Sequence, residues 1–263
     1  MNTRRLFPLL LLVAVLPASA QALNAVPPDA SLNRAGTAST AIPFAELGAK
    51  ATADYKGDAI GITATDEGAT LRTGFQKLAG TVTREGLRLE STEAAGGTLQ
   101  LAAHAVGRVD GAVQMLPKTG HIASTSTLVT FSRPGLVEEY SVSADGVRQD
   151  FIVASEPAGS GALSVELALS GATAEAAADG ATFTLAGSGR VLAYSRLKVT
   201  DARGQALPAT LAVRSPTRLA LQVQDAGAVY PVRIDPTFSD ADWVSLNPGI
   251  PGSNGRIKAA VVD

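Results

Sequence analysis

The residues of this chain that could do chemistry are few and widely spaced. Two histidines, His104 and His121, and no cysteine occur in 263 residues. A histidine serves as a catalytic base or a metal ligand only where a second group orients it, and neither histidine lies in such a motif. Without cysteine there is no thiol nucleophile, no thiolate-bound metal and no lipid-modified cysteine. We interpret both histidines as solvated or capping side chains.

A pair of adjacent acids, Glu138 and Glu139, is a candidate for glycoside hydrolysis, which needs two carboxylates on either side of one bond. Adjacent residues of a strand point to opposite faces of the sheet, so this pair cannot flank one substrate. We predict that one of them points outward and that the other forms an ion pair, with Arg133 or Arg148. No Gly-x-Ser-x-Gly motif of a serine hydrolase occurs. The sequence therefore indicates no catalytic residue.

Three acids toward the end of the chain, Asp235, Asp240 and Asp242, could supply oxygen ligands to Ca²⁺. Their spacing matches no complete calcium loop, and a turn-rich linker explains them equally well. They form a weak calcium candidate, and no other cofactor is indicated. Trp243 is the single tryptophan, which could stack on a sugar if exposed or anchor the next module if buried. Its position at the start of a new segment favours the anchor.

The first twenty residues have the three parts of an export signal. Arg4 and Arg5 precede an apolar stretch over residues 6–16, and small residues then predict cleavage after Ala20. The apolar stretch is shorter than the roughly 20 residues that a bilayer span needs. We therefore expect an exported protein, secreted or at the cell surface, with no membrane span in the mature chain. The ordinary secretory route is favoured over the twin-arginine route, which residues 3–7 also resemble.

The composition limits both the partners and the fold. The chain has 22 Lys and Arg against 24 Asp and Glu, so its mildly acidic surface gives no attraction to nucleic acid. Hydrophobic residues make up 46% of the chain, whereas aromatic residues make up only 5%. The core must therefore consist of many aliphatic contacts spread over broad faces.

Alternation of apolar and polar residues with a period of two dominates from about residue 59 onward. Residues 163–169, 181–185 and 219–223 are clear examples, and Asp-Gly or Glu-Gly turn signals separate such runs. We predict an all-β fold, an antiparallel β-sandwich. Only residues 172–178 have a composition that favours helix, and Asp179-Gly180 would end such a helix within two turns.

Five segments follow from these patterns. An export signal and a flexible lead come first. Two β regions then meet near Pro117, and the sequence leaves open whether they are separate domains or halves of one sandwich. After them comes a Gly- and Pro-rich linker with a strand-like run, the truncated start of a repeat domain. The segments are residues 1–20, 21–43, 44–117, 118–238 and 239–263.

Three ordered motifs give the chain a resemblance to a known group of proteins. They are Arg133–Tyr140 with Asp145–Phe151, Leu192–Val199 with Asp201–Gly204, and Ala228–Pro236. Together they resemble the N-terminal β-rich module of large bacterial secreted or surface proteins, in which β-propeller-type repeats (Kelch-like or FG-GAP-like) follow. The resemblance covers roughly residues 44–263. It implies that residues from Asp240 onward begin the first propeller blade of a longer protein, and it carries no catalytic residues.

The motifs also predict the local environment of three tyrosines and of one aspartate. Tyr140, Tyr194 and Tyr230 could each bury a ring while the hydroxyl reaches a polar partner. Asp201 to Gly204 is expected to form a turn in which Asp201 accepts hydrogen bonds from its own backbone.

The leading hypothesis for function is a non-catalytic structural or interaction module of an exported bacterial protein, placed ahead of a repeat domain. The export signal, the two-residue period and the motifs support it. A carbohydrate-binding or adhesive module, with a surface glycan or protein as partner, is the alternative. A secreted hydrolase is the third hypothesis and has no catalytic motif behind it.

Overall fold

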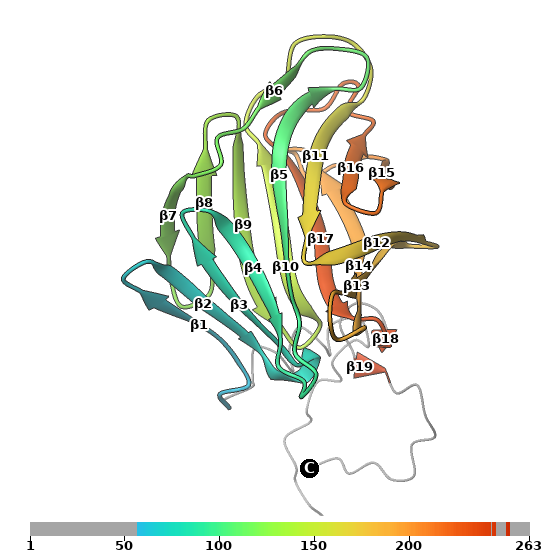
Figure 1. Ribbon diagram of the computed structural model, residues 1–263. Coiled ribbons are helices and arrows are strands. Elements are labelled where there is room, and N and C mark those ends of the chain that lie inside the picture. Colours follow the sequence, from blue (N-terminus) through green and yellow to red (C-terminus); the bar gives the residue numbers. More distant parts are fainter. Residues whose placement is uncertain (1–56, 243, 246–250, 253–263) are drawn as a thin grey trace, which may run out of the picture. The chain divides into compact units, whose positions relative to one another are not determined.

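Two antiparallel β-sheets packed face to face make up the folded part of the chain (Figure 1). The computed structural model describes residues 57–242, 244–245 and 251–252. The predicted export signal with its cleavage site at Ala20, the flexible lead over residues 21–43, and Trp243 lie outside the described residues. The prediction of an all-β, antiparallel sandwich is confirmed.

Sheet A has nine strands. Its first five strands are consecutive in the chain, and each pairs with the next. The other strands of the sheet come from later segments of the chain. A 3-10 turn, η2 (Gly74–Gln76), lies between the second and third strands. In spatial order the sheet contains β1 (Ile60–Thr65), β2 (Gly68–Thr73), β3 (Leu78–Thr83), β4 (Gly86–Ser91), β5 (Thr98–Arg108), β11 (Leu163–Ser170), β16 (Arg218–Val223) and β15 (Ala209–Ser215), with β6 (Val113–Met115) paired to β5.

Sheet B has eight strands and packs on sheet A. Two meanders, one of four strands and one of three, lie on either side of β17 (Val232–Asp240), the last long strand among the described residues. In spatial order the sheet contains β12 (Ala172–Ala177), β13 (Gly180–Leu185), β14 (Val191–Thr200), β17 (Val232–Asp240), β10 (Gly146–Val153), β9 (Leu136–Ser143), β8 (Val129–Arg133) and β7 (His121–Ser124). A separate pair, β18 (Val244–Ser245) and β19 (Pro251–Gly252), follows.

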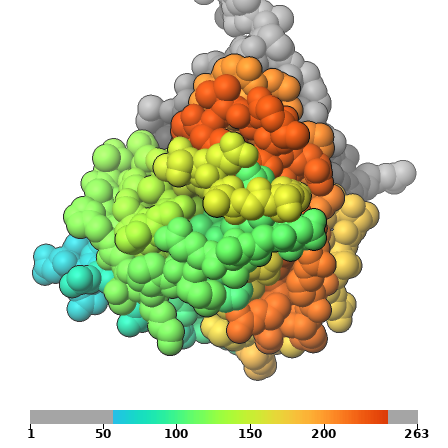
Figure 2. Space-filling model, turned by 90° about the horizontal axis from the view of Figure 1, so that it is seen from above, coloured from blue at the N-terminus to red at the C-terminus, as the bar shows by residue number. Residues whose placement is uncertain are grey.

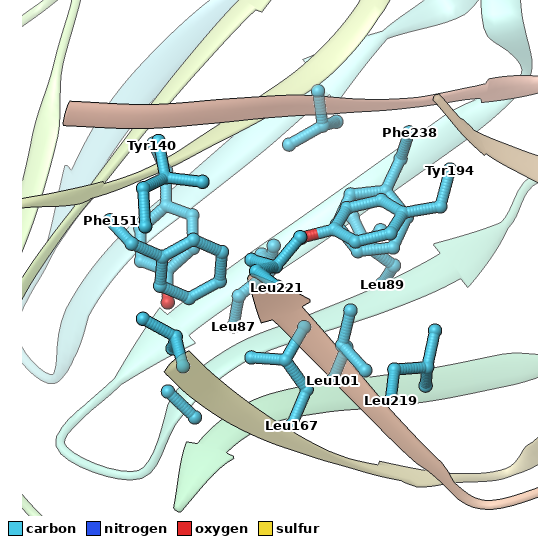
Figure 3. Close-up of a cluster of buried hydrophobic side chains, with 14 of the residues drawn as sticks. Leu87, Leu89, Leu101, Tyr140, Phe151, Leu167, Tyr194, Leu219, Leu221 and Phe238 are labelled. Atoms are coloured by element: carbon cyan, nitrogen blue, oxygen red, sulfur yellow. The ribbon is translucent and has the colours of Figure 1, made fainter. Parts of the chain in front are cut away.

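The core lies between the two sheets and is unevenly divided between aromatic and aliphatic residues (Figure 3). Sheet B contributes the rings, including Phe183, Tyr194 and Phe238, whose centroids are 5.5 Å (Phe183–Tyr194) and 4.3 Å (Tyr194–Phe238) apart. Sheet A contributes mainly leucines, among them Leu101 and Leu167. The alternating pattern of the sequence therefore places its apolar residues as expected, because every second side chain of a strand faces the same way.

Both predicted β regions contribute to this one core. Strands β1 to β6 come from residues 44–117, but β11, β15 and β16 of the second region complete the same sheet. The helix-favouring run over residues 172–178 forms strand β12 instead of a helix, because pairing with β13 and the burial of Ala172 and Ala174 outweigh the helix propensity of alanine.

Strand β17 occupies the centre of sheet B, between β14 and β10. Pro236 lies within it, and the ladder to β14 shifts register between Ser195 and Lys198, opposite this proline. Gly146, in the predicted Asp145-Gly146 turn, has φ 136°, and a Cβ there would lie 1.8 Å from the carbonyl oxygen of Phe238. The close approach of this turn to β17 therefore requires glycine.

Candidate functional site

The two histidines lie apart and in different settings. His104, on β5, is half-buried, and its Nδ1 lies 2.8 Å from the carbonyl oxygen of Glu166 on the neighbouring strand β11. His121 is exposed at the start of β7, at the edge of sheet B. The structure therefore does not bring the two imidazoles together.

Glu138 lies in the interior of the sandwich, and it is the centre of a buried polar network. Its carboxylate pairs with the guanidinium of Arg133. The Tyr140 hydroxyl and the Gln149 amide each donate to Glu138 Oε2 at 2.8 Å. The Tyr194 hydroxyl donates to Gln149 Oε1 at 2.9 Å, which extends the network across the sheet. The ion pair of Glu138 with Arg133 is one of the two that the sequence predicted.

This network also connects the two sheets. Arg133 donates to the carbonyl oxygen of Ala103, on β5 of sheet A, at 2.9 Å. Burial raises the pKa of Glu138, although Arg133 and the hydrogen-bond donors around the carboxylate oppose the shift. Burial and the neighbouring Glu138 carboxylate also raise the pKa of Tyr140 well above its usual value. The polar groups of the network thus pair with one another in the core, where an unpaired charge would lower the stability of the fold.

Glu139 points to the outer face of sheet B, as expected from alternation. There it belongs to what we call the outer charge array, formed by Glu139, Arg148, Asp150, Arg233 and Asp235. Arg148 donates to both carboxylate oxygens of Asp150, at 2.8 and 2.7 Å. Arg233 bridges Glu139, at 2.8 Å, and Asp150. Arg148 Nε also lies 3.4 Å from Asp235 Oδ1.

Asp235 is the weakly paired member of the array. Burial and the nearby Asp150 carboxylate raise its pKa to about 6, and the attraction of Arg148 compensates only in part. The side chain of Asp150, in contrast, is almost fully enclosed by its two arginine partners. Asp235 is therefore the carboxylate of this array whose ionisation works against the fold near pH 6.

The raised pKa of Asp235 predicts a pH-dependent stability. An acid whose pKa is higher in the folded than in the unfolded chain destabilises the fold once it ionises, so its cost appears as the pH rises from about 4 to about 6. Asp235→Asn removes this cost. We expect the free energy of unfolding of the variant, relative to the wild type, to increase by up to about 2–3 kcal/mol across that window. Urea unfolding at pH 4, 5, 6 and 7 measures it, and a difference that is constant with pH would contradict it.

The end of β17, at the lower end of the view in Figure 1, is held by groups from both sheets. We call this cluster the basal clamp, and its members are Gln76, Lys77, Ser91, Arg190 and Asp240. The buried Arg190 guanidinium donates to Asp240 Oδ2 at 2.9 Å and to Ser91 Oγ at 2.9 Å. It also donates to the carbonyl oxygens of Gln76 and Lys77, at 2.7 and 2.8 Å. The backbone N–H of Asp240 donates to Gln76 Oε1 at 2.8 Å. One arginine therefore fastens the end of sheet B to sheet A.

The fold separates Asp235 from the other two acids singled out for calcium, Asp240 and Asp242. Asp235 and Asp240 are five residues apart in one extended strand, roughly 17 Å at the usual rise per residue. Asp235 belongs to the outer charge array, and Asp240 pairs with Arg190. Asp242 is exposed, and its backbone N–H donates to Asp240 Oδ1 at 3.0 Å. Within the described residues, no group of three or more His, Asp or Glu side chains is placed to hold a metal ion.

A third buried arginine, Arg108, joins the loops at the opposite end of the sandwich. Arg108 pairs with Asp225 at 2.6 Å and donates to the carbonyl oxygens of Pro157 and Gly161, at 3.1 and 3.2 Å. Tyr230 donates its hydroxyl to the same Asp225. Figure 2 shows the connected segments side by side, green around β5 and β6, yellow before β11 and orange before β17. All three motif tyrosines therefore find the polar partners that the sequence predicted.

Asp201 forms the predicted turn. Its Oδ1 accepts hydrogen bonds from the backbone N–H groups of Arg203 and Gln205, both at 2.9 Å, and Gly204 has φ 78°. Its Oδ2 accepts from the N–H of Val229 at 3.1 Å. Although burial acts in the opposite direction, these donors lower the pKa of Asp201 to about 2.

We predict that Asp201→Ala loosens this turn and removes an acid-sensitive part of the stability. The pKa of Asp201 is lower in the folded than in the unfolded chain, so its contribution is complete above about pH 4 and is lost as the pH falls toward 2. Amide hydrogen exchange should become faster at Arg203, Gln205 and Val229 in the variant. Unchanged exchange at these three amides would contradict the prediction.

Sequence reasoning missed Arg108 and Arg190 as residues that hold the ends of the sandwich. Arg190 directly follows Gly187-Ser188-Gly189, which the sequence shows only as a turn. Arg108 ends the long strand β5, before Asp110-Gly111. In the sequence, each of these arginines stands alone between a turn and an apolar strand, which could have indicated a buried role. Their partners could not be identified, because they lie up to 117 residues away in the chain.

Comparison with protein-family models, with curated proteins and with solved structures finds no match for this chain. Among the described residues, no helix has the length and apolarity needed to cross a membrane. In the described residues, buried arginines join the two sheets and fix the loops and the end of β17 through their ion pairs.

Proposed function

We propose that this chain supplies a non-catalytic scaffold module of an exported bacterial protein, which carries a following repeat domain from the end of β17. The observation that carries the proposal is the attachment of β17. This strand is central in sheet B, and its last residue, Asp240, is bound by Arg190 and Gln76. Whatever follows residue 242 is thereby joined to a rigid point.

The central position of β17 supports a mechanical role. A strand with a neighbour on both sides shares any pull on its end between two antiparallel ladders, to β14 and to β10. A terminal strand at the edge of a sheet would have only one ladder to resist the same pull. The basal clamp adds a connection to sheet A at the point where the pull is applied.

The use of the ionisable groups supports a structural role as well. The buried carboxylates Glu138, Asp150 and Asp225 each pair with an arginine, and Asp201 accepts backbone hydrogen bonds. Their bonding capacity is directed to other parts of the fold, which rigidifies it. Export in this proposal rests on the sequence of residues 1–20, and the bacterial surface location rests on the resemblance carried by the three motifs.

An immunological experiment in the source organism tests the proposal. Antibodies against residues 57–242 should detect an exported polypeptide that lacks residues 1–20 and is longer than this chain, with repeats identified by mass spectrometry after residue 242. Detection only in the cytoplasm would contradict export. A hydrolytic activity of the purified protein that disappears when one acidic residue is changed would contradict the non-catalytic role.

A further inference from the structure

An open groove of about 970 Å³ lies at one edge of the sandwich, and none of the residues of the basal clamp lines it. Its walls are the β1–β2 turn (residues 65–68), the β3–β4 turn (residues 83–85) and strand β7 with the preceding Gly120. Figure 1 shows β7 at the outer end of sheet B, next to these two turns of sheet A. The groove therefore separates the edge of one sheet from the turns of the other.

Strand β7 has a free edge toward this groove. It is the last strand of sheet B and pairs only with β8. The N–H of Gly120 donates away from β8, to the carbonyl oxygen of Arg84, at 2.9 Å. Since backbone groups two residues apart in a strand point the same way, those of Ile122 and Ser124 also point away from β8. They offer the hydrogen-bonding pattern that an added strand requires.

The charges around the groove indicate which kind of strand would fit. Asp66, Glu67 and Glu85 are exposed on its walls, against a single guanidinium, that of Arg84. No ion pair joins any of these three carboxylates to another described residue. In the outer charge array, in contrast, Glu139 and Asp150 each form ion pairs with arginine.

The lining also argues against a sugar as the occupant. Its side chains are small, polar or aliphatic, with Ile122 as the apolar element, and no Trp, Tyr or Phe ring is among them. Stacking on an aromatic face, the contact expected of a sugar site from Trp243, is therefore not available from these walls. A groove of this size with a free strand edge instead fits a short extended peptide.

We propose that this groove binds an extended peptide segment with basic side chains, which adds as a strand to the free edge of β7. The backbone of Ile122 and Ser124 provides the hydrogen bonds. Glu67 and Glu85 attract the basic side chains, and Ile122 packs against an apolar side chain between them. The proposal concerns strand β7 and the two turns beside it and involves neither β17 nor the basal clamp, so it stands independently of the proposed scaffold function.

Fluorescence anisotropy with labelled hexapeptides tests the proposal on the full chain. The probes are alternating Lys-Val and Glu-Val peptides and a Lys-Val peptide that is N-methylated at alternate amides, which blocks one backbone edge. The double variant Glu67→Gln/Glu85→Gln removes charge from the groove. The double variant Glu90→Gln/Glu175→Gln removes the same charge at exposed positions elsewhere and serves as the matched control.

We expect the Lys-Val peptide to bind and the Glu-Val peptide not to bind. The groove variant should weaken binding by about tenfold or more, and the control variant should leave it within about twofold. N-methylation should abolish binding, because the added strand loses its hydrogen bonds. Equal weakening by both double variants, or binding that N-methylation does not change, would overturn the proposal, as would no detectable binding of the Lys-Val peptide.

Discussion

Arg133→Met is expected to lower the free energy of unfolding by about 3–5 kcal/mol, because it leaves a buried carboxylate without its cation. Glu138 is 1% exposed, and Arg133 is its cationic partner in the core. The variant also loses the hydrogen bond from Arg133 to the carbonyl oxygen of Ala103 on sheet A. Guanidinium chloride unfolding at pH 7, followed by circular dichroism, measures the loss.

The double variant Arg133→Met/Glu138→Met separates the cost of an unpaired charge from the worth of the ion pair. Replacing both partners by apolar groups of similar size should recover most of the lost free energy of unfolding. The reason is that most of this loss comes from burying the Glu138 carboxylate without a cation. Glu139→Gln is the control, because Glu139 is the neighbouring acid but pairs on the outer face with a partly exposed Arg233. It should cost less than about 1 kcal/mol. A double variant as unstable as Arg133→Met would contradict this explanation.

Arg190→Met is expected to cost about 2–4 kcal/mol, because it removes the donor that holds both sheets at the basal clamp. The buried carbonyl oxygens of Gln76 and Lys77 lose a donor, and Asp240 loses its cation. The loss should be local as well as global. Amide hydrogen exchange should accelerate most at Asp240 and around η2, and less in the β8–β9 hairpin.

Lys77→Met provides the matched control for the basal clamp. The Lys77 ammonium pairs with Glu93 at 2.8 Å, but 61% of the lysine side chain is exposed. Ion pairs at such positions contribute less than about 1 kcal/mol. If Lys77→Met and Arg190→Met destabilised the protein equally, the basal clamp would not hold the sheets together as described.

Much of the sandwich could be predicted from the sequence because alternation reports the face of each residue directly. The network around Glu138 was also partly visible. Arg133, Glu138 and Gln149 occupy the apolar phase of their strands, since each lies two residues from a buried Phe131, Tyr140 or Phe151. Polar residues in that phase of hairpin neighbours predict a buried network, because hairpin strands pair with each other.

The order of the strands could not be predicted, because it depends on contacts between distant segments. Alternation does not predict that β11 pairs with β5 or that β17 lies between β14 and β10. For the same reason Asp240 reads as a free acid in the sequence. Its partner Arg190 lies 50 residues earlier and reaches it only once both strands are in place.

The position of β17 has a consequence for the order of folding. Sheet B consists of two meanders, β7 to β10 and β12 to β14, that are joined only through a strand coming after both of them in the chain. Until residues 232–240 are available, β10 and β14 each lack a neighbour, and the aromatic half of the core lacks Phe238. Completing the sheet thus depends on contacts of large sequence separation, which form late. If such a chain crosses a membrane in the extended state, N-terminus first, sheet B can be completed only after residues 232–240 of β17 reach the far side.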